Sequence, residues 1–341
     1  MHSLGRAIIA GVGVLILGCA CLAGCSATAG TASSHGLKTV VVELDWVPNP
    51  DHAGLYYAIE KGFFKREGLQ VVLHVPSSVD DPAKLVALNK VDLAISYPVI
   101  MLSAQAQGLP IVAVDGIFPR TLEALIVSPK AGVTTIKGLS GHRIGYDDAS
   151  DQTLLNACLK HGGLNPGNVS EVNVGFSIVP ALLSGKVNAI IGGLQNVEAI
   201  QIGQEMKQHP VVFPLSTTCG IPNHNELILA ANSQRLTSDP AYASLVRKFL
   251  KALNAGTVAA EANPQGSLAI MEHVSQYSKP FLKVSVPLTL HLLVPPSGER
   301  PGCLYTSQWQ IYGTFMHSHG LITNNPVISQ AMTDKYLPYA C

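Results

Sequence analysis

Strand-like apolar runs alternate with helix-like segments along the first third of the chain, and this alternation restricts the fold more than any other feature. The strand-like runs are rich in Val, Ile and Leu and are bounded by turn residues. They lie at 39–44, 69–75, 91–97 and 110–117, and the helix-like segments lie at 52–61, 81–88 and 99–107. Such alternation predicts an α/β fold with mostly parallel sheets.

One helix–turn–strand unit occurs twice. Lys90–Tyr97 is similar to Lys186–Gly193, and a short helical run precedes each. Two such units indicate two similar lobes, each presenting the carboxyl end of its strand to a shared cleft. The first unit would then place Ser96 and Tyr97 at this cleft, and the second would continue into 194–198. Chance similarity between apolar strands is the alternative.

The chain of 341 residues is longer than one hydrophobic core usually serves, so we expect two domains. Apolar runs at 122–128 and 226–231 are interpreted as crossover strands between them. The first lobe is then discontinuous, with 38–125 plus 228–341, and the second lobe spans 126–227.

Composition and motifs argue against several functions. The chain has 47% hydrophobic residues, 13% charged residues and a formal net charge of zero. A compact protein without affinity for nucleic acid is therefore expected. We also expect it to be a monomer. Common catalytic and phosphate-binding motifs are absent, and His317-x-His319 has no third partner at a metal-ligand spacing. We expect no enzyme activity, cofactor or metal.

The N-terminus has the pattern of a targeting segment. Arg6 precedes an apolar run at 7–17, which suits a signal peptide better than a spanning helix. Leu22-Ala23-Gly24-Cys25 resembles the lipobox of bacterial lipoproteins, which implies cleavage before Cys25, acylation of Cys25 and anchoring to the membrane. Residues 1–25 are thus predicted to be the leader with its acylated cysteine, and 26–37 a flexible tether.

Four cysteines remain after this segment, namely Cys158, Cys219, Cys303 and Cys341. An even number outside the cytoplasm suggests disulfides, and four cysteines allow three pairings. We favour Cys158 with Cys219 and Cys303 with Cys341, because each bridge then stays within one expected lobe. Four buried thiols are the alternative.

A rigid turn follows the first expected strand. Pro48 and Pro50 interrupt regular structure directly after Trp46. Trp46 offers a flat face for stacking, and Asn49 offers both a donor and an acceptor. This pair suits a small planar heterocycle. Alternatively, Trp46 fills a hinge and Asn49 makes an Asx turn.

The stretch around this turn resembles the solute-binding proteins of ABC importers for thiamine-pyrimidine precursors. This family belongs to a larger group that includes riboflavin, nitrate and sulfonate binders. The matching residues are Asp45-Trp46-x-Pro48-Asn49-x-x-His52-x-Gly54-Leu55-Tyr56-x-Ala58-x-x-Lys61-Gly62-Phe63-Phe64-x-x-Glu67-Gly68-Leu69. The resemblance implies a two-lobed fold of the periplasmic-binding-protein type II class, with mostly parallel sheets and a central cleft.

The resemblance also implies a second wall for the cleft, from a Gly-Gly-aromatic-x-Asn-x-Glu segment. It maps onto Gly192, Gly193, Leu194, Asn196 and Glu198. The Glu198 carboxylate can accept from an amino group on the ligand or share a proton with a ring nitrogen. An ordinary solvated helix position is the alternative for Glu198. Leu194 replaces the aromatic residue, so Tyr97 or Tyr146 would supply the second face.

The loop at 145–151 contains Asp147, Asp148 and Asp151 but no lysine or arginine. Relatives that bind phosphopyrimidines would hold the phosphate here, and three carboxylates repel a phosphate. The loop therefore predicts an uncharged ligand, such as a dephosphorylated hydroxymethyl-aminopyrimidine. Helix capping by solvated acids is the alternative.

Together these features predict a lipid-anchored solute-binding protein on the extracytoplasmic face of the bacterial plasma membrane, which delivers a thiamine pyrimidine precursor to ABC permease subunits. Riboflavin, or a sulfonate or nitrate held by Arg120, are alternative ligands. An extracytoplasmic pyrimidine-modifying enzyme is an alternative of another class, although the eukaryotic synthases resembling this family carry clustered cysteines and this chain does not. The residues expected to bind the ligand are Asp45, Trp46, Asn49, His52, Ser96, Tyr97, Tyr146, Asn196 and Glu198.

Overall fold

The computed structural model describes residues 36–295, 299–324 and 326–341. The leader, the acylated Cys25 and most of the tether predicted above lie outside these residues. Among the helices in the described ranges, none combines the length and apolarity needed to cross a membrane.

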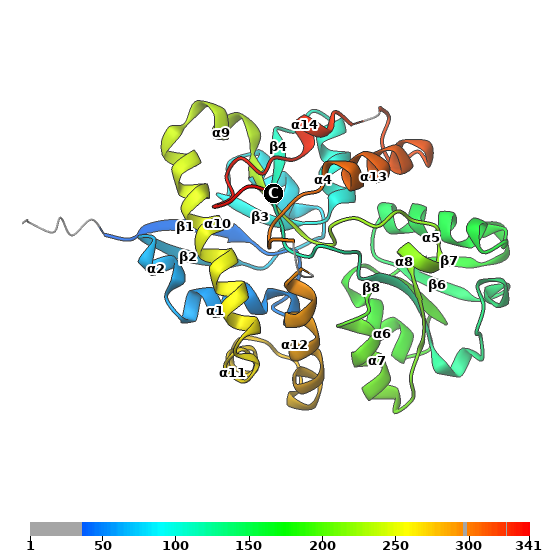
Figure 1. The fold of residues 1–341 in the computed structure, drawn as a ribbon. Coiled ribbons are helices and arrows are strands. Elements are labelled where there is room, and N and C mark those ends of the chain that lie inside the picture. Colours follow the sequence, from blue (N-terminus) through cyan, green and yellow to red (C-terminus); the bar gives the residue numbers. More distant parts are fainter. Residues whose placement is uncertain (1–35, 296–298, 325) are drawn as a thin grey trace, which may run out of the picture. The chain divides into compact units, whose positions relative to one another are not determined.

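The first of two five-stranded sheets has the order β2-β1-β3-β10-β4 (Figure 1). Its strands are β1 (Lys38–Glu43), β2 (Leu69–His74), β3 (Leu93–Ser96), β4 (Ile111–Gly116) and β10 (Ile228–Asn232). β1 pairs in parallel with both β2 and β3, whereas β10 runs antiparallel to β3 and β4. One returning strand therefore interrupts an otherwise parallel sheet.

The second sheet has the order β7-β6-β8-β5-β9. Its strands are β5 (Glu123–Val127), β6 (Arg143–Tyr146), β7 (Ser170–Asn173), β8 (Ala189–Leu194) and β9 (Val211–Pro214). β5 is antiparallel to β8 and β9, while β6 is parallel to β7 and β8. The two sheets are thus built alike, and the repeated strands β3 and β8 both occupy the central place. The expected crossover segments form β5 and β10, the antiparallel strand of each sheet.

Helices pack around each sheet, and we call the elements around the first sheet the first lobe and those around the second sheet the second lobe. Those of the second lobe, coloured green in Figure 1, are α5 (Ala149–His161), α6 (Ile178–Leu183), α7 (Glu198–Met206) and α8 (Leu215–Thr218). Those of the first lobe are α1 (Ala53–Glu60), α2 (Phe63–Arg66), α3 (Asp81–Ala87), α4 (Pro98–Ala106), α9 (Ser233–Ser238), α10 (Pro240–Glu261), α11 (Pro264–Val274), α12 (Lys279–Leu293), α13 (Thr306–Ser318) and α14 (Ile328–Ala331). Short 3₁₀ turns occur at Pro50–His52, Pro129–Ala131, Ile136–Leu139, Pro166–Asn168 and Gly175–Ser177.

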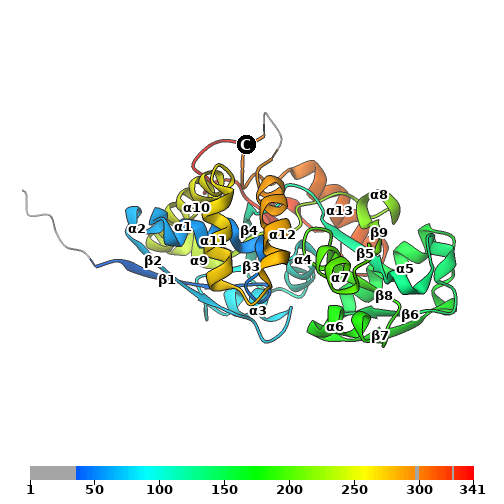
Figure 2. The same cartoon turned by 90° about the horizontal axis from the view of Figure 1, so that it is seen from below.

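The long helix α10 lies against α1, and both views show the two helices side by side (Figures 1 and 2). Glycines permit this approach, because a Cβ added to Gly256 would lie 2.4 Å from that of Ala58. A Cβ on Gly54 would lie 2.5 Å from the Thr257 hydroxyl. This packing fixes α1, and with it the turn that carries Trp46 and Asn49.

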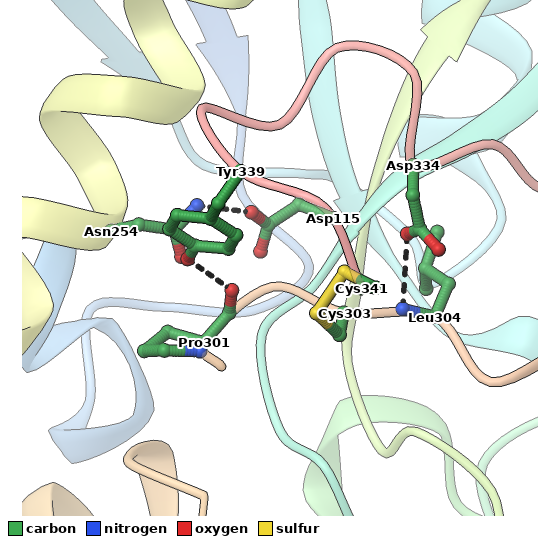
Figure 3. The surroundings of a disulfide bond; sticks show 8 residues. All are labelled: Asp115, Asn254, Pro301, Cys303, Leu304, Asp334, Tyr339 and Cys341. Carbon is green, nitrogen blue, oxygen red and sulfur yellow. Dashed lines mark hydrogen bonds between the residues drawn. A yellow bond between two sulfur atoms is a disulfide. The ribbon is translucent and has the colours of Figure 1, made fainter. Parts of the chain in front are cut away.

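The structure confirms both favoured disulfides, Cys158–Cys219 and Cys303–Cys341. The second ties the C-terminal residue to the loop before α13, beside the buried hydrogen bond of 2.7 Å from Asn254 to Asp115 (Figure 3). The Tyr339 hydroxyl donates to a backbone carbonyl of the same loop. The C-terminal segment is thereby fastened to this loop, and a bridge between Met332 and Ala113 joins it to the edge strand β4.

Candidate functional site

A cavity opens where strands of both sheets end, with an empty volume of about 580 Å³ that includes space open to solvent. Ligands of α/β proteins commonly bind at this end of parallel strands. Its lining residues are Trp46, Asn49, Asp51, Val79, Tyr97, Val99, Ile100, Glu123, Asp147, Asp148, Asp151, Ile178, Gly192, Leu194 and Glu198. Both lobes contribute, so the cavity is a site between the two sheets.

The turn after β1 places Trp46 and Asn49 at this cavity. Asn49 caps the 3₁₀ turn that follows: its side-chain oxygen accepts from the Asp51 amide at 2.8 Å, and its own amide donates to His52 Nδ1 at 3.3 Å. The Asx-turn alternative for Asn49 is therefore realised, yet the residue still lines the cavity. Capping holds its side chain in one orientation at the cavity wall.

Asp45 and His52 do not line the cavity themselves, but they support residues that do. One Asp45 oxygen bonds to His52 Nε2 at 2.8 Å, and the other accepts from the Tyr97 hydroxyl at 2.9 Å. Burial and the neighbouring Asp45 charge raise the pKa of Tyr97 well above its usual value. Tyr97 therefore stays a protonated donor, fixed at the cavity wall by Asp45.

An aromatic residue of the second lobe contacts Trp46. The ring of Phe176 meets the indole edge-to-face, with centroids 4.1 Å apart and planes at 81°. Phe176 lies in the 3₁₀ turn before α6 and is 40% exposed. The sequence expected Tyr97 or Tyr146 opposite Trp46, and Phe176 was missed because a lone aromatic in a polar loop carries no distinguishing pattern.

Asn196 joins the lobes instead of lining the cavity. Its side-chain nitrogen donates to Asp51 at 2.6 Å and to the Thr289 hydroxyl at 2.8 Å. The Ser285 hydroxyl donates to its backbone carbonyl. Asn196 is fully buried, so these bonds connect the loop after β8 to the 3₁₀ turn and to α12 of the first lobe.

Glu198 lies at the first turn of α7 and lines the cavity. One of its oxygens accepts from the Leu194 amide at 2.8 Å. Burial raises the pKa of Glu198 to about 7, although that hydrogen bond opposes the rise. Near neutral pH its carboxyl can thus either accept from a ligand or share a proton with it.

Further acids make the remaining wall. Burial raises the pKa of Asp147 to about 6, and it raises the pKa values of Asp51, Glu123 and Asp151 well above their usual range. No lysine or arginine lines this cavity in the part of the chain that the structure describes. Arg120 instead pairs with Glu299 at 2.9 Å and lines a different hollow. The charged side chains of the described cavity wall are therefore all carboxylic acids.

Besides Asp45, His52 and Asn196, two more expected ligand contacts do not lie on the cavity wall. Ser96 is fully buried at the end of β3, and Tyr146 packs against an apolar core cluster. Both end a strand whose next residue, Tyr97 or Asp147, reaches the cavity. Glu123 was missed because the sequence suggested only a crossover strand at 122–128, and Asp51 was not among the expected contacts.

The fold and the cavity define the class of protein. The structure resembles the alkanesulfonate-binding protein SsuA from Xanthomonas axonopodis pv. citri, with a TM-score of 0.68 and 16% identity over 87% of this chain and 99% of that one. It also resembles the periplasmic nitrate-binding protein NrtA from Synechocystis PCC 6803, with a TM-score of 0.64 and 12% identity over 88% and 87% of the two chains. The expected periplasmic-binding-protein type II fold is thus confirmed.

The sequence comparisons then identify the family. A model described as NMT1/THI5 like matches residues 49–267. A putative thiamine biosynthesis protein from Haemophilus influenzae is 32% identical over 86% of this chain and 90% of its own length. A formylaminopyrimidine-binding protein from Halalkalibacterium halodurans is 30% identical over 64% and 66%. The chain belongs to the NMT1/THI5-like family, as the resemblance in its sequence implied.

Proposed function

We propose that this protein is the solute-binding component of an ABC importer and that it binds an unphosphorylated aminopyrimidine precursor of thiamine. The observation that carries this proposal is the cavity itself. Trp46 supplies a flat aromatic face, and Asn49 and Glu198 supply hydrogen-bonding groups beside it. A small heteroaromatic ring with amino substituents matches this combination.

The absence of lysine and arginine from the described cavity wall argues against an anionic ligand. A phosphate, sulfonate or nitrate placed beside Asp147 and Glu198 would gain no compensating positive charge. We therefore favour the unphosphorylated pyrimidine over phosphopyrimidine, sulfonate and nitrate. Riboflavin, a larger flat ligand, is included in the titration described below.

We further propose that the protein acts outside the cytoplasm, as a monomer anchored through Cys25. Its two disulfides fit an oxidising compartment. We also propose that the lobes, 38–125 plus 228–341 and 126–227, close by hinge motion at the crossovers. Glu226 supports this hinge, because its side chain accepts from the backbone amides of Leu122 at 2.5 Å and Glu123 at 3.0 Å.

An enzyme is the second candidate. The 4-amino-5-hydroxymethyl-2-methylpyrimidine phosphate synthase THI13 of Saccharomyces cerevisiae is 27% identical over 65% of this chain and 66% of its own length. All four cysteines in the described ranges are disulfide-bonded, and none belongs to a cluster of thiols. We favour binding without turnover. Release of a modified pyrimidine by the purified protein alone would reverse this choice.

Calorimetric titration tests the binding proposal. The ligands are 4-amino-5-hydroxymethyl-2-methylpyrimidine, its phosphate ester and riboflavin, each added to purified protein. We expect the unphosphorylated pyrimidine to bind best. Trp46→Ala should weaken it by about tenfold to a hundredfold, since base–aromatic stacking contributes about 1–3 kcal/mol, whereas Trp46→Phe should retain most of the affinity. Unchanged affinity in Trp46→Ala removes the stacking role, and stronger binding of the phosphate ester removes the charge argument.

A further inference from the structure

A groove adjoins the cavity between the two lobes, with an empty volume of about 1030 Å³ that includes space open to solvent. The groove and the cavity share three lining residues, namely Trp46, Ile178 and Glu198. The other walls of the groove come from the 3₁₀ turn at Gly175–Ser177, from α6 and α7, and from the start of α12 with the loop before it. Figure 2 shows α7 of the second lobe beside α12 of the first. The groove therefore leads from the surface to the cavity.

The contact between Trp46 and Phe176 lies where these two spaces meet. Trp46 lines both of them, whereas Phe176 lines the groove and not the cavity. Phe176 belongs to the second lobe and Trp46 to the first, so their edge-to-face contact crosses from one lobe to the other. An edge-to-face aromatic pair is a modest interaction. This contact can therefore break and form again while both lobes stay folded.

Phe176 is held more weakly than Trp46. Its ring is 40% exposed, and a Cβ added to the preceding Gly175 would have no atom within 4 Å. By contrast, hydrogen bonds of Asp45 and Asn49 fix the segment that carries Trp46. Exposed side chains change rotamer quickly compared with the motions of whole domains. Phe176 is thus the mobile partner of the pair, and Trp46 is the fixed one.

The groove also suits the ligand proposed for the cavity. Side-chain amides of Gln201, Gln204 and Gln276 line it together with aromatic residues. Amides offer both donors and acceptors, and aromatic rings stack on flat ligands. The charged residues on its described wall are Glu198 and Glu205, both acids. An uncharged heteroaromatic solute therefore finds weak contacts along the groove, and an anionic solute does not.

We propose that the groove is the path by which the ligand enters the cavity and that Phe176 is the gate on this path. The ring moves away from Trp46 to admit the ligand and returns after the ligand has passed. A gate that does not line the cavity lowers or raises the barrier equally for entry and for exit. Phe176 therefore sets the rates of exchange, while Trp46, Asn49 and Glu198 set the affinity. This inference rests on the proposed function, because it assigns a kinetic role at the same site.

Stopped-flow fluorescence with the purified full chain and 4-amino-5-hydroxymethyl-2-methylpyrimidine tests the gate. The chain has two tryptophans, and Trp309 is 1% exposed, so a signal on binding reports Trp46. An edge-to-face pair contributes about 0.5–1.5 kcal/mol, which corresponds to a rate change of about twofold to tenfold. Phe176→Ala should raise the association and dissociation rate constants together by this factor and leave Kd within about twofold. Ile311→Ala, an exposed apolar residue on α13, should change neither rate.

A matched pair of substitutions tests the path. Gln201→Tyr adds bulk to the groove wall and should slow association and dissociation severalfold. Gln208→Tyr makes the same change just beyond α7, at an exposed residue that does not line the groove, and should leave both rates unchanged.

The outcomes separate this inference from the proposed function. If Phe176→Ala weakens binding through faster dissociation alone, Phe176 stabilises the closed lobes or the bound ligand, and the gate is overturned. Unchanged rates in Phe176→Ala overturn the gate as well, and unchanged rates in Gln201→Tyr overturn the groove as the path. In each of these cases pyrimidine binding stands. Absence of binding by the parent protein, checked by calorimetry, overturns both proposals.

Discussion

Replacing Glu198 with glutamine should stabilise the unliganded protein above neutral pH. Glu198 is 7% exposed, and its pKa is raised to about 7, chiefly by burial. Glutamine keeps a carbonyl oxygen for the Leu194 amide, which Glu198 binds at 2.8 Å. The variant therefore preserves the local hydrogen bond and removes only the charge.

The size of the effect follows from linkage. Below the usual carboxyl pKa of 4.5, the folded and unfolded states both hold the proton, and Glu198 contributes no pH dependence. As the pH rises, the unfolded state loses the proton first, so the raised pKa lowers the free energy of unfolding until the folded state ionises near pH 7. At about 1.4 kcal/mol for each pH unit, the loss is about 3 kcal/mol. Glu198→Gln should recover about this amount at pH 8 and almost none at pH 4.5.

Urea unfolding followed by circular dichroism at several pH values from about 4.5 to 8.5 measures this difference. Glu205→Gln is the matched control, because Glu205 lies on the same helix but is exposed; it should change the free energy of unfolding by less than about 0.5 kcal/mol at every pH. A difference between Glu198→Gln and the parent protein that stays constant with pH would refute the reasoning. A difference that grows as the pH falls would refute it as well.

Two further changes test the framework of the site. Gly192→Ala should destabilise the protein more than Gly108→Ala does. Both glycines have φ of +86°, but only Gly192 lies against Asp151. The larger loss in the free energy of unfolding, measured with urea, therefore reports the steric conflict. Equal effects of the two alanines would contradict the close approach. Removing either disulfide by paired Cys→Ala changes should lower the free energy of unfolding by about 4 kcal/mol, because the bridges close loops of 61 and 38 residues in the unfolded chain. A loss below about 1 kcal/mol would show that the bridge does not restrain the unfolded chain.

The order of strands and helices around the first sheet followed from the sequence, because hydrophobic periodicity is strong there. The expected strands at 39–44, 69–75, 91–97 and 110–117 correspond to β1, β2, β3 and β4. The repeat also correctly marked β3 and β8 as equivalent. By contrast, β7 was not anticipated, since Ser170–Asn173 contains a single apolar residue and is a polar edge strand. Its pairing with β6 defines it, and pairing is not visible in local composition.

The cavity was predicted in part, for a related reason. Trp46, Asn49, Tyr97 and Glu198 line it, and each follows or begins an element that the sequence located. Glu123 reaches the same cavity from a strand that looked like a simple connection. Its role depends on the packing of β5 between β8 and β9, which no local pattern encodes. The pairing of strands far apart in the sequence therefore determines which acidic residues lie together at the cavity.

Only some residues of the turn after β1 line the cavity, and the hydrogen bonds show what the others do. Asp45 and His52 do not reach the cavity; they fix Tyr97 and the capped 3₁₀ turn. Asn196 likewise binds Asp51 and Thr289 and so ties the second lobe to that turn. A ligand that enters between the lobes meets groups already held in place, so less conformational entropy is lost on binding. None of these hydrogen bonds involves the cavity-lining residues Leu194, Glu123 or Asp151, so those three residues can change without disturbing the turn.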